Sequence, residues 1–268
     1  MKIIDCVTYF DEDLILKLRL NILYNIVDKF IISEGIYDHR GNKRDTKFNI
    51  SNFEKFSNKI VYIRVEDFPT LDDPWKMLRH QRNSSMNYIR QCDPEDYILI
   101  SDVDEIPNPE KVKEFINNKN NKNDIGVFKQ LFFYYKLNLL NFSTPEWFGT
   151  KICKVKKLKN PDWLRGYKSK QYAWWRLDKP KNLKIILKGG WHFSFLYDVN
   201  GIIKKISSYQ HKEFDNTNIK NSDLIKKKIV NGEDIFNRGY KFKKIEIDEK
   251  FPDYIIKNKN NLINWIED

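Results

Sequence analysis

"YILISDVDEIP", residues 97 to 107, places three carboxylates directly after a short apolar run. The run, Tyr97 to Ile100, has the composition of a buried strand, and Asp102, Asp104 and Glu105 follow it. In a strand that continued through residue 104, the period of two would send Asp102 and Asp104 to the same side. Two carboxylates on one side repel each other unless a cation lies beside them. The stretch therefore predicts a cation site at the end of a strand.

The residues before this motif alternate between strand and helix patterns. Short apolar runs predict strands at residues 2–10, 28–35, 59–67 and 97–102. Helical periodicity predicts helices at residues 11–26, 52–59 and 74–91, the first with Asp11 as its N-cap. This order is typical of an α/β protein with an open, mostly parallel sheet and helices on both faces. Such sheets bind ligands beyond the carboxyl ends of their strands.

No glycine-rich phosphate loop accompanies these strands. GxGxxG does not follow the first strand, and GxxxxGK[ST] does not occur in the chain. Any bound phosphate would need another partner, and Mn²⁺ or Mg²⁺ held by Asp102 and Asp104 would supply one. The ion would also stabilise the charge on a departing nucleoside diphosphate.

Other interpretations of the acidic motif remain open. Pro107 and Pro109 follow it, so it could be a polar turn that only ends the strand. A metal-dependent phosphotransferase or phosphatase could use the same carboxylates, although dehalogenase-type phosphatases carry this motif on their first strand, with Thr or Val where Ile106 stands here. A basic nucleic-acid-binding protein would explain the net charge of +11, but not the acidic strand ends.

Composition limits the remaining classes. The 268 residues are 41% hydrophobic, enough to bury the core of one large domain or two small ones. Three widely spaced cysteines form no CxxC pair, so the sequence predicts no disulfide framework. No apolar run is long enough to span a bilayer, and "MKIIDCVTYF" lacks the features of a leader. We expect a cytoplasmic protein with at most peripheral membrane contact.

Four segments together resemble glycosyltransferase family 17: "ISEGIYDHRGNKRDTKF" (32–48), "DPWKMLRHQRN" (73–83), "ISDVDEIPNPE" (100–110) and "GGWHFSF" (189–195). The resemblance extends from Met1 to about residue 235. It implies a GT-A type fold, an inverting mechanism, a UDP-sugar donor (UDP-N-acetylglucosamine) and a glycan or glycolipid acceptor, with no nucleic-acid partner. We expect a single domain over 1–268, with a donor half (1–110), an acceptor half (111–235) and a C-terminal extension (236–268).

The resemblance also assigns roles around the motif. Asp102 and Asp104 match the DxD motif of the family, so Asp104 is expected to bind the metal directly and Asp102 the metal or the donor ribose. Glu105 is expected to orient these ligands. Arg82 and Asn83 match the family QRN segment and are expected to lie on the donor side.

Two strand ends and the later GWH segment complete the predicted donor and metal site. Thr8 and Glu34 close the first two strands and are expected to contact the donor. "LKIILKGGWHFSFL" (183–196) predicts two strands around a Gly-Gly break, with Trp191, Phe193 and Phe195 on one side. His192 faces the other side, matches the family GWH and is a candidate third metal ligand.

An inverting transfer needs a general base beside the acceptor hydroxyl, and a carboxylate is the usual group. Glu146 in "STPEWFGT", predicted on a turn beside Trp147, is the candidate, with Asp198 and Glu213 as competitors. Trp174 and Trp175 either line the acceptor site or belong to the core. Amphipathic patterns predict helices at residues 202–211 and 222–232, whose lysines are either solvated or rest on an anionic membrane.

Overall fold

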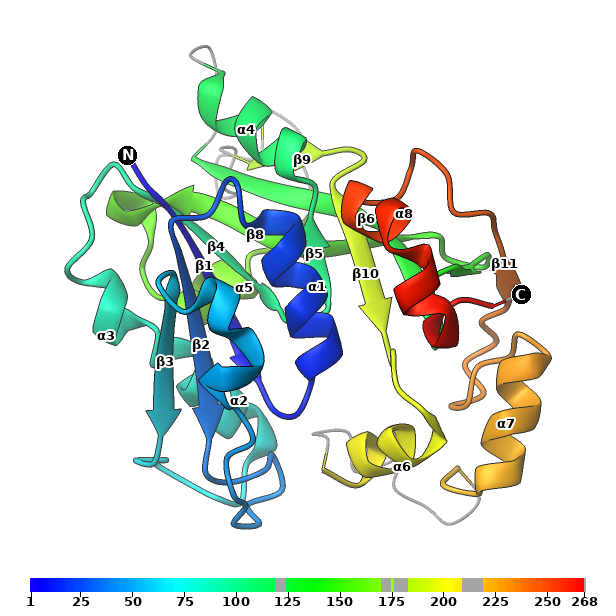
Figure 1. Ribbon diagram of the computed structural model, residues 1–268. Coiled ribbons are helices and arrows are strands. Elements are labelled where there is room, and N and C mark those ends of the chain that lie inside the picture. Colours follow the sequence, from blue (N-terminus) through cyan, green and yellow to red (C-terminus); the bar gives the residue numbers. More distant parts are fainter. Residues whose placement is uncertain (119–123, 170–174, 176–182, 209–218, 268) are drawn as a thin grey trace.

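The computed structural model describes residues 1–118, 124–169, 175, 183–208 and 219–267. These residues form an open, mixed sheet of 11 strands with helices on both faces (Figure 1). The predicted α/β class, an open sheet flanked by helices, is therefore confirmed.

The N-terminal half of the sheet is parallel, as predicted. Its strands lie in the order β4-β1-β2-β3. They are β1 (Ile3–Tyr9), β2 (Lys29–Gly35), β3 (Ile60–Val65) and β4 (Tyr97–Asp102). Helices cover both faces of this half, so a side chain on either side of a strand meets apolar neighbours, and the strands appear in the sequence as continuous apolar runs.

The remaining strands make the sheet mixed. β8 (Glu146–Lys154) lies between β4 and β6 (Ile125–Tyr134), antiparallel to both. β7 (Leu139–Asn141) and β11 (Phe242–Lys244) extend the edge beyond β6, each antiparallel to its neighbour. The turn after β7 is set by Asn141, whose side chain accepts hydrogen bonds from the two backbone N–H groups that follow it at 143 and 144.

Three further strands pair near β6. β5 (Glu105–Pro107) pairs with β10 (Gly190–Ser194), and β10 and β9 (Leu183–Ile186) each pair parallel to β6. Gly190 has a φ of +129°, and a Cβ there would lie 2.2 Å from the carbonyl oxygen of Ile106. The predicted Gly-Gly break thus lets β10 approach β5 closely.

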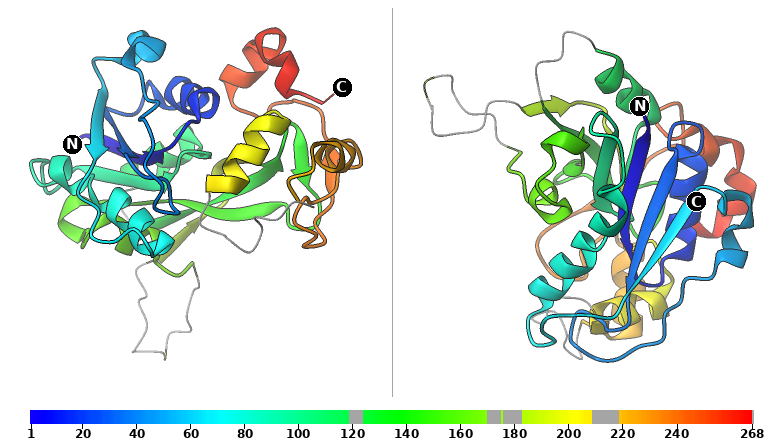
Figure 2. Two further views of the ribbon diagram at one scale, coloured as in Figure 1. Left: turned by 90° about the horizontal axis from the view of Figure 1, so that it is seen from below. Right: turned by 90° about the vertical axis from the view of Figure 1, so that its left-hand side faces the viewer.

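The helices pack on the two faces of the sheet. α1 (Asp13–Leu23), the 3₁₀ helix η1 (Ile50–Phe56), α4 (Pro109–Asn117), α8 (Asp253–Lys257) and the 3₁₀ helix η4 (Lys259–Trp265) contribute to one core cluster. The opposite cluster includes residues of α3 (Met86–Ile89) and α5 (Pro161–Arg165). Figure 2 shows α1 and α8 on one side of the sheet and α3 and α5 on the other. The remaining helices are α2 (Pro74–Asn83), the 3₁₀ helix η2 (Val155–Lys157) and α7 (Ser222–Val230).

Two helix predictions need correction. The predicted helix at 74–91 is broken into α2 and α3, because the hydroxyls of Ser84 and Ser85 hydrogen-bond to carbonyls three residues earlier at the break. The predicted N-cap of the first helix, Asp11, is one residue too early, because α1 begins at Asp13 and Glu12 occupies the cap position.

α6 (Val199–Ser208) follows β10 through a sharp turn. Phe195 in this turn has a φ of +53°. The prediction that Phe195 shares a side with Trp191 and Phe193 is therefore wrong: those two pack in the main core cluster, whereas Phe195 packs with α6. The predicted division of one domain at residue 110 stays a prediction. The sheet itself is continuous across it, because β4 pairs with β8.

Within the ranges that the structure covers, no helix combines the length and apolar composition needed to cross a bilayer.

A buried ion pair joins α1 to the centre of the sheet. Arg19 is 0% exposed, and its guanidinium donates two hydrogen bonds of 2.6 and 2.7 Å to the carboxylate of Asp5 on β1. It also donates to the hydroxyl of Ser101 on β4 at 2.6 Å. The pair therefore connects three elements inside the protein.

Replacing Arg19 with methionine would leave the Asp5 carboxylate buried without its partner. We expect Arg19→Met to lower the free energy of unfolding by about 3–5 kcal/mol. Lys17→Met, on the exposed side of the same helix, serves as control and should change it by less than about 0.5 kcal/mol. Urea denaturation of both variants measures the difference, and equal midpoints would contradict the structural role of the pair.

Candidate active site

A cavity of about 510 Å³ lies at the carboxyl ends of β1 and β4. Thr8 and Asp102 line it from the parallel half of the sheet, and Phe132, His192 and Lys205 line it from β6, β10 and α6. In Figure 1 the arrowheads of β2, β3 and β10 point toward the lower edge of the sheet, where α6 lies. The cavity is thus at the edge where open parallel sheets bind their ligands, and its volume falls within the range of about 300–1,000 Å³ that is usual for ligand sites.

The acidic motif forms a tight turn at this edge. β4 ends at Asp102, residues 103 and 104 form the turn, and β5 begins at Glu105. The strand therefore ends at residue 102, as predicted, and the period of two does not extend to Asp104. Both aspartates still face the cavity, because Arg19 holds the turn from below: its guanidinium donates to the carbonyl of Glu105 at 2.8 Å and to those of Asp102 and Val103 at 3.4 Å.

Asp102 is enclosed by two arginines. Arg82 donates to one of its carboxylate oxygens at 3.1 Å and Arg165 to the other at 2.8 Å. Burial alone would raise the pKa of Asp102, but the charges of Arg165 and Arg82 outweigh it and hold the pKa well below its usual value. This pairing argues against Asp102 as a direct metal ligand and as a phosphotransfer nucleophile. The carboxylate instead positions two arginines at the cavity wall.

Glu105 is the buried anchor of the turn. Its carboxylate accepts hydrogen bonds from the indole N–H of Trp147 and from Arg165, both at 2.7 Å, and from the backbone N–H of Asp102 at 3.2 Å. Burial raises the pKa of Glu105, and the charge of Arg165 offsets this only in part. Glu105 therefore fixes the orientation of one aromatic and one basic side chain in the cavity lining.

Asp104 faces a different set of partners. Its Oδ1 lies 3.5 Å from Nε2 of His192, and its Oδ2 lies 3.8 Å from Nζ of Lys205. Burial opposes ionisation of Asp104, but the interactions with His192 and Lys205 prevail and lower its pKa. The carboxylate is thus ionised at neutral pH, and no arginine that the structure describes donates a hydrogen bond to it.

The Asp104–His192 pair is the place where a metal ion fits best. Both ligands of one Mn²⁺ or Mg²⁺ lie about 2.1 Å from it, so a separation of 3.5 Å suits two ligands of one ion. Nδ1 of His192 is buried without a hydrogen-bond partner among the described residues. The predicted three-ligand set is not assembled: in the described part of the chain, no group of three acidic, histidine or cysteine side chains could hold an ion. Phosphate oxygens and water would have to complete the coordination.

Glu12 lies next to this pair. Its carboxylate accepts hydrogen bonds from the backbone N–H groups of Phe10 and Asp11 at 2.7 and 3.1 Å. Burial raises the pKa of Glu12, whereas the charge of Lys205 and these hydrogen bonds lower it less. The charge of Lys205 therefore lowers the pKa of two carboxyls, Glu12 and Asp104.

Stacked rings form one side of the cavity. We call this side the aromatic wall and define it as Phe132, Trp147, His192 and Tyr240. Phe132 stacks on the His192 ring at a centroid distance of 4.7 Å, and Trp147 tilts against both rings at 5.5 and 5.1 Å. Tyr240 meets Phe132 edge-on at 6.4 Å. Trp147 remains 37% exposed, with its indole fixed by Glu105. The wall thus presents a rigid, exposed indole to the cavity.

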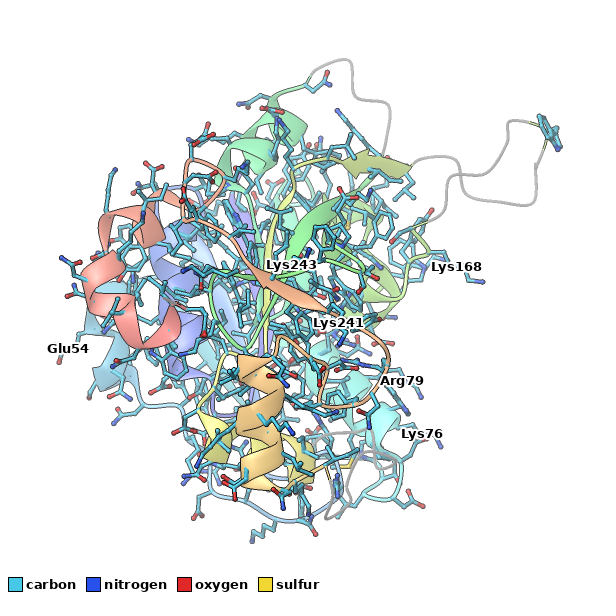
Figure 3. The ribbon with its side chains drawn as sticks, turned by 90° about the vertical axis from the view of Figure 1, so that its right-hand side faces the viewer. Glu54, Lys76, Arg79, Lys168, Lys241 and Lys243 are labelled. Atoms are coloured by element: carbon cyan, nitrogen blue, oxygen red, sulfur yellow. The ribbon has the colours of Figure 1, made fainter. Side chains whose placement is uncertain are left out.

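The open rim is basic on the α2 side. Arg79 lines the cavity mouth, and Lys76 lies one turn earlier on the same helix. Figure 3 shows both side chains projecting from the lower right of the molecule. Exposed positive charge at the mouth of a cavity attracts anionic ligands.

Besides Asp102, four residues were predicted to contact the donor, and only two of them line the cavity. Thr8 and Arg82 line the cavity, whereas the Asn83 side chain accepts a hydrogen bond from the backbone N–H of Asp162 and helps to place α5. Donor contact of Thr8 and Arg82 stays a prediction.

Glu34 does not line the cavity in the structure. Its carboxylate is 0% exposed and accepts hydrogen bonds from the backbone N–H groups of Lys47 and Phe48 at 2.7 and 3.0 Å. It also accepts one from Tyr62 and forms an ion pair with Arg44. Glu34 therefore organises the loop after β2, and its predicted contact with the donor needs correction.

The acceptor-side predictions also change. Glu146 is the first residue of β8 rather than part of a turn, forms an ion pair with Lys129 and lies outside the cavity lining, so the structure does not support it as the base. Asp198 is exposed and accepts a hydrogen bond from the backbone N–H of residue 201 in the first turn of α6. Trp175 is 65% exposed and therefore not core. Trp174 and Glu213 lie outside the described residues.

The cavity residues that were not predicted include three charged side chains near the acidic turn: Glu12, Arg165 and Lys205. Arg165 follows "NPDW", whose Asn160 and Pro161 signal a helix start, but nothing in the sequence connects this short helix to the acidic motif. Lys205 lies in an amphipathic helix in which lysines are ordinary solvent-exposed residues. Glu12 resembles any acidic residue at a helix N-terminus.

Residues 1–150 of the chain match the model of glycosyltransferase family 17. The chain is also similar to the human β-1,4-mannosyl-glycoprotein 4-β-N-acetylglucosaminyltransferase, at 24% identity over 80% of this chain and 44% of the relative. The rat protein of the same name is 28% identical over 40% of this chain and 22% of its own length. The chain thus spans less than half the length of these curated relatives.

Two solved structures are similar to the chain at lower sequence identity. 4-diphosphocytidyl-2C-methyl-D-erythritol synthase from Anaerococcus prevotii aligns with a TM-score of 0.40 and 12% identity, over 75% of this chain and 93% of that one. The inositol-1-phosphate CTP transferase from T. maritima aligns with a TM-score of 0.36 and 13% identity, over 69% and 84% of the two chains.

Lys151 supports the cavity wall from behind. It is 4% exposed, and its ammonium donates hydrogen bonds to the backbone carbonyls of Arg165 and Tyr167 at the end of α5. Burial, assisted by the charge of Arg165, lowers the pKa of Lys151 from 10.5 to about 8. The ammonium that holds the backbone at Arg165 is therefore itself titratable near pH 8.

Between pH 8 and 10.5 the unfolded chain binds a proton at Lys151 that the native protein has released. The free energy of unfolding should therefore rise with pH in this window, and Lys151→Met should remove that part of the rise. Urea denaturation at several pH values measures the slope. Lys168→Met, which removes an exposed lysine, serves as control and should keep the wild-type slope. Equal slopes for wild type and Lys151→Met would contradict the prediction.

Proposed function

Because the chain belongs to glycosyltransferase family 17, we propose that its cavity binds a nucleotide sugar and transfers the sugar, with inversion, to a glycan hydroxyl. UDP-N-acetylglucosamine is the proposed donor. The observation that carries the proposal is the Asp102–Glu105 turn, which lies within the matched residues and presents an ionised Asp104 opposite His192 at the carboxyl edge of the sheet.

The charges of the cavity support a bound divalent cation. Each arginine in the inner lining is already paired: Arg82 with Asp102 and Asp162, Arg165 with Asp102 and Glu105, and Arg238 with Asp234. These pairs leave little uncompensated positive charge for a diphosphate. Asp104 and His192 would hold Mn²⁺ or Mg²⁺, and the mixed carboxylate and imidazole donor set favours Mn²⁺. When bound, the ion would neutralise the diphosphate and stabilise the leaving nucleoside diphosphate.

The two sides of the cavity suit the two substrates. The nucleotide would lie over the ends of β1 and β4 and against α2, where Thr8, Arg82 and the basic rim are found. The acceptor would lie on the aromatic wall, because the exposed indole of Trp147 can stack on the apolar face of a sugar ring. The names of the human and rat relatives suggest a β-mannosyl unit of a glycan as that acceptor.

A panel of nucleotide sugars tests this proposal. We expect UDP-N-acetylglucosamine at about 100 times its Kd to raise the Tm of the protein by about 5 °C with Mn²⁺ but not with EDTA. Asp104→Ala and His192→Ala should abolish the shift, because each removes one of the two ligands. Asp223→Ala, which removes an exposed carboxylate on α7, should retain it.

Two results would contradict the proposal. One is the absence of a shift with every nucleotide sugar and metal tested. The other is a shift that persists in EDTA and in both variants, which would retain nucleotide binding but reject the metal site. Slow hydrolysis of the stabilising nucleotide sugar, followed by detection of the released UDP, provides the independent readout.

A further inference from the structure

We propose that Lys205 on α6 provides the protein's own positive charge for the leaving nucleoside diphosphate. The inference rests on the proposed function, because it concerns the same donor. It adds a catalytic residue that is distant from the acidic motif in sequence and lies outside the residues that match the family.

The position of Lys205 is fixed by its neighbours. Its side chain is only 20% exposed, and its ammonium lies 3.8 Å from Oδ2 of Asp104, the oxygen that does not face His192. The rings of Phe195 and Tyr197 lie 5.1 and 5.2 Å from the ammonium. These rings confine the charge to the cavity side of α6, beside the place where the metal and the diphosphate would lie.

Lys205 is also the inner cation of the cavity with the most capacity to bind a ligand. The three paired arginines donate to carboxylates at 2.7 to 3.1 Å. Lys205, in contrast, makes no hydrogen bond to any residue that the structure describes; its nearest carboxylate oxygen there is the one at 3.8 Å. An ammonium has three N–H donors, so donors remain for phosphate oxygens that enter between Lys205 and Asp104.

One continuous segment carries both groups that face Asp104. β10 bears His192, the turn at Phe195 redirects the chain, and α6 bears Lys205. α6 is held against the N-terminal half by an ion pair from Lys204 to Asp11 and by a hydrogen bond from Arg40 to the carbonyl of Ile206. The unit therefore brings an imidazole and an ammonium to opposite oxygens of a single carboxylate.

The chemical role follows from the bond that breaks. In transfer, the bond between the anomeric carbon and the bridging oxygen of the β-phosphate breaks, and its electron pair stays on that oxygen. A hydroxyl oxygen of the acceptor, or of water in donor hydrolysis, forms the new bond to carbon, and its proton passes to solvent. UDP therefore carries more negative charge on its terminal phosphate than the intact nucleotide sugar does. A cation beside that phosphate should bind UDP more strongly than the donor.

Isothermal titration of UDP and of UDP-N-acetylglucosamine, both with Mn²⁺, tests the inference. In Lys205→Met we expect the affinity for UDP to fall by about tenfold or more relative to that for UDP-N-acetylglucosamine, and the kcat of donor hydrolysis to fall by about a hundredfold. Lys205→Arg should restore part of both, because it keeps the charge. Lys226→Met, which removes an exposed lysine on α7 outside the cavity lining, is the control and should leave both affinities and the hydrolysis rate near the wild-type values.

The outcomes separate this inference from the proposed function. Equal loss of both ligands, or loss of neither, would overturn it, because a lysine that only neutralises Asp104 and Glu12 does not distinguish UDP from its sugar ester. If thermal denaturation shows that Lys205→Met is not folded, Lys205→Gln is measured in its place. Failure of the wild-type protein to bind either nucleotide would overturn the proposed function together with this inference.

Discussion

The guanidinium of Arg19 is the interaction on which the candidate site depends. It is buried between α1 and the sheet, pairs with Asp5 on β1, and donates to Ser101 on β4 and to the backbone carbonyls of the acidic turn. A charge in this place would be very unfavourable without such partners. With these partners, the Arg19 guanidinium fixes the position of the Asp102–Glu105 turn relative to β1 and β4. Arg19 thus holds the backbone of the turn, and the side chains of Asp102 and Asp104 face the cavity.

A second layer of charge pairs organises what the turn presents. Asp102 and Glu105 hold Arg165, and Arg82 connects Asp102 to Asp162 on α5. These pairs are nearly neutral as a group, so they shape the cavity more than they attract a substrate. Asp104 is outside them and faces a histidine and a lysine instead. Within the motif, Asp102 and Glu105 hydrogen-bond to arginine, and Asp104 is the carboxylate that we propose as the metal ligand.

The sequence predicts the parts of this arrangement that depend on local pattern. Residues 97–102 form a strand with the predicted bounds, and the acidic turn lies at the carboxyl edge of the sheet as expected. Arg82 and His192, named through a family resemblance, line the same cavity. Glu34 and Glu146 were misplaced because their partners, Arg44 and Lys129, are basic residues of ordinary appearance whose contacts follow only from the folded chain. Arg165 reaches Asp102 across 63 residues of sequence, and no periodicity reports such a contact.

Asp104 and His192 are the proposed site for the metal ion and the diphosphate. A crystal structure of the protein grown with UDP and Mn²⁺, with anomalous diffraction from manganese, tests that claim most directly. We expect an anomalous peak within ligand distance of the Asp104 carboxylate and of Nε2 of His192, with the UDP diphosphate on its open side. Manganese bound elsewhere, or UDP bound away from the acidic turn, would contradict it.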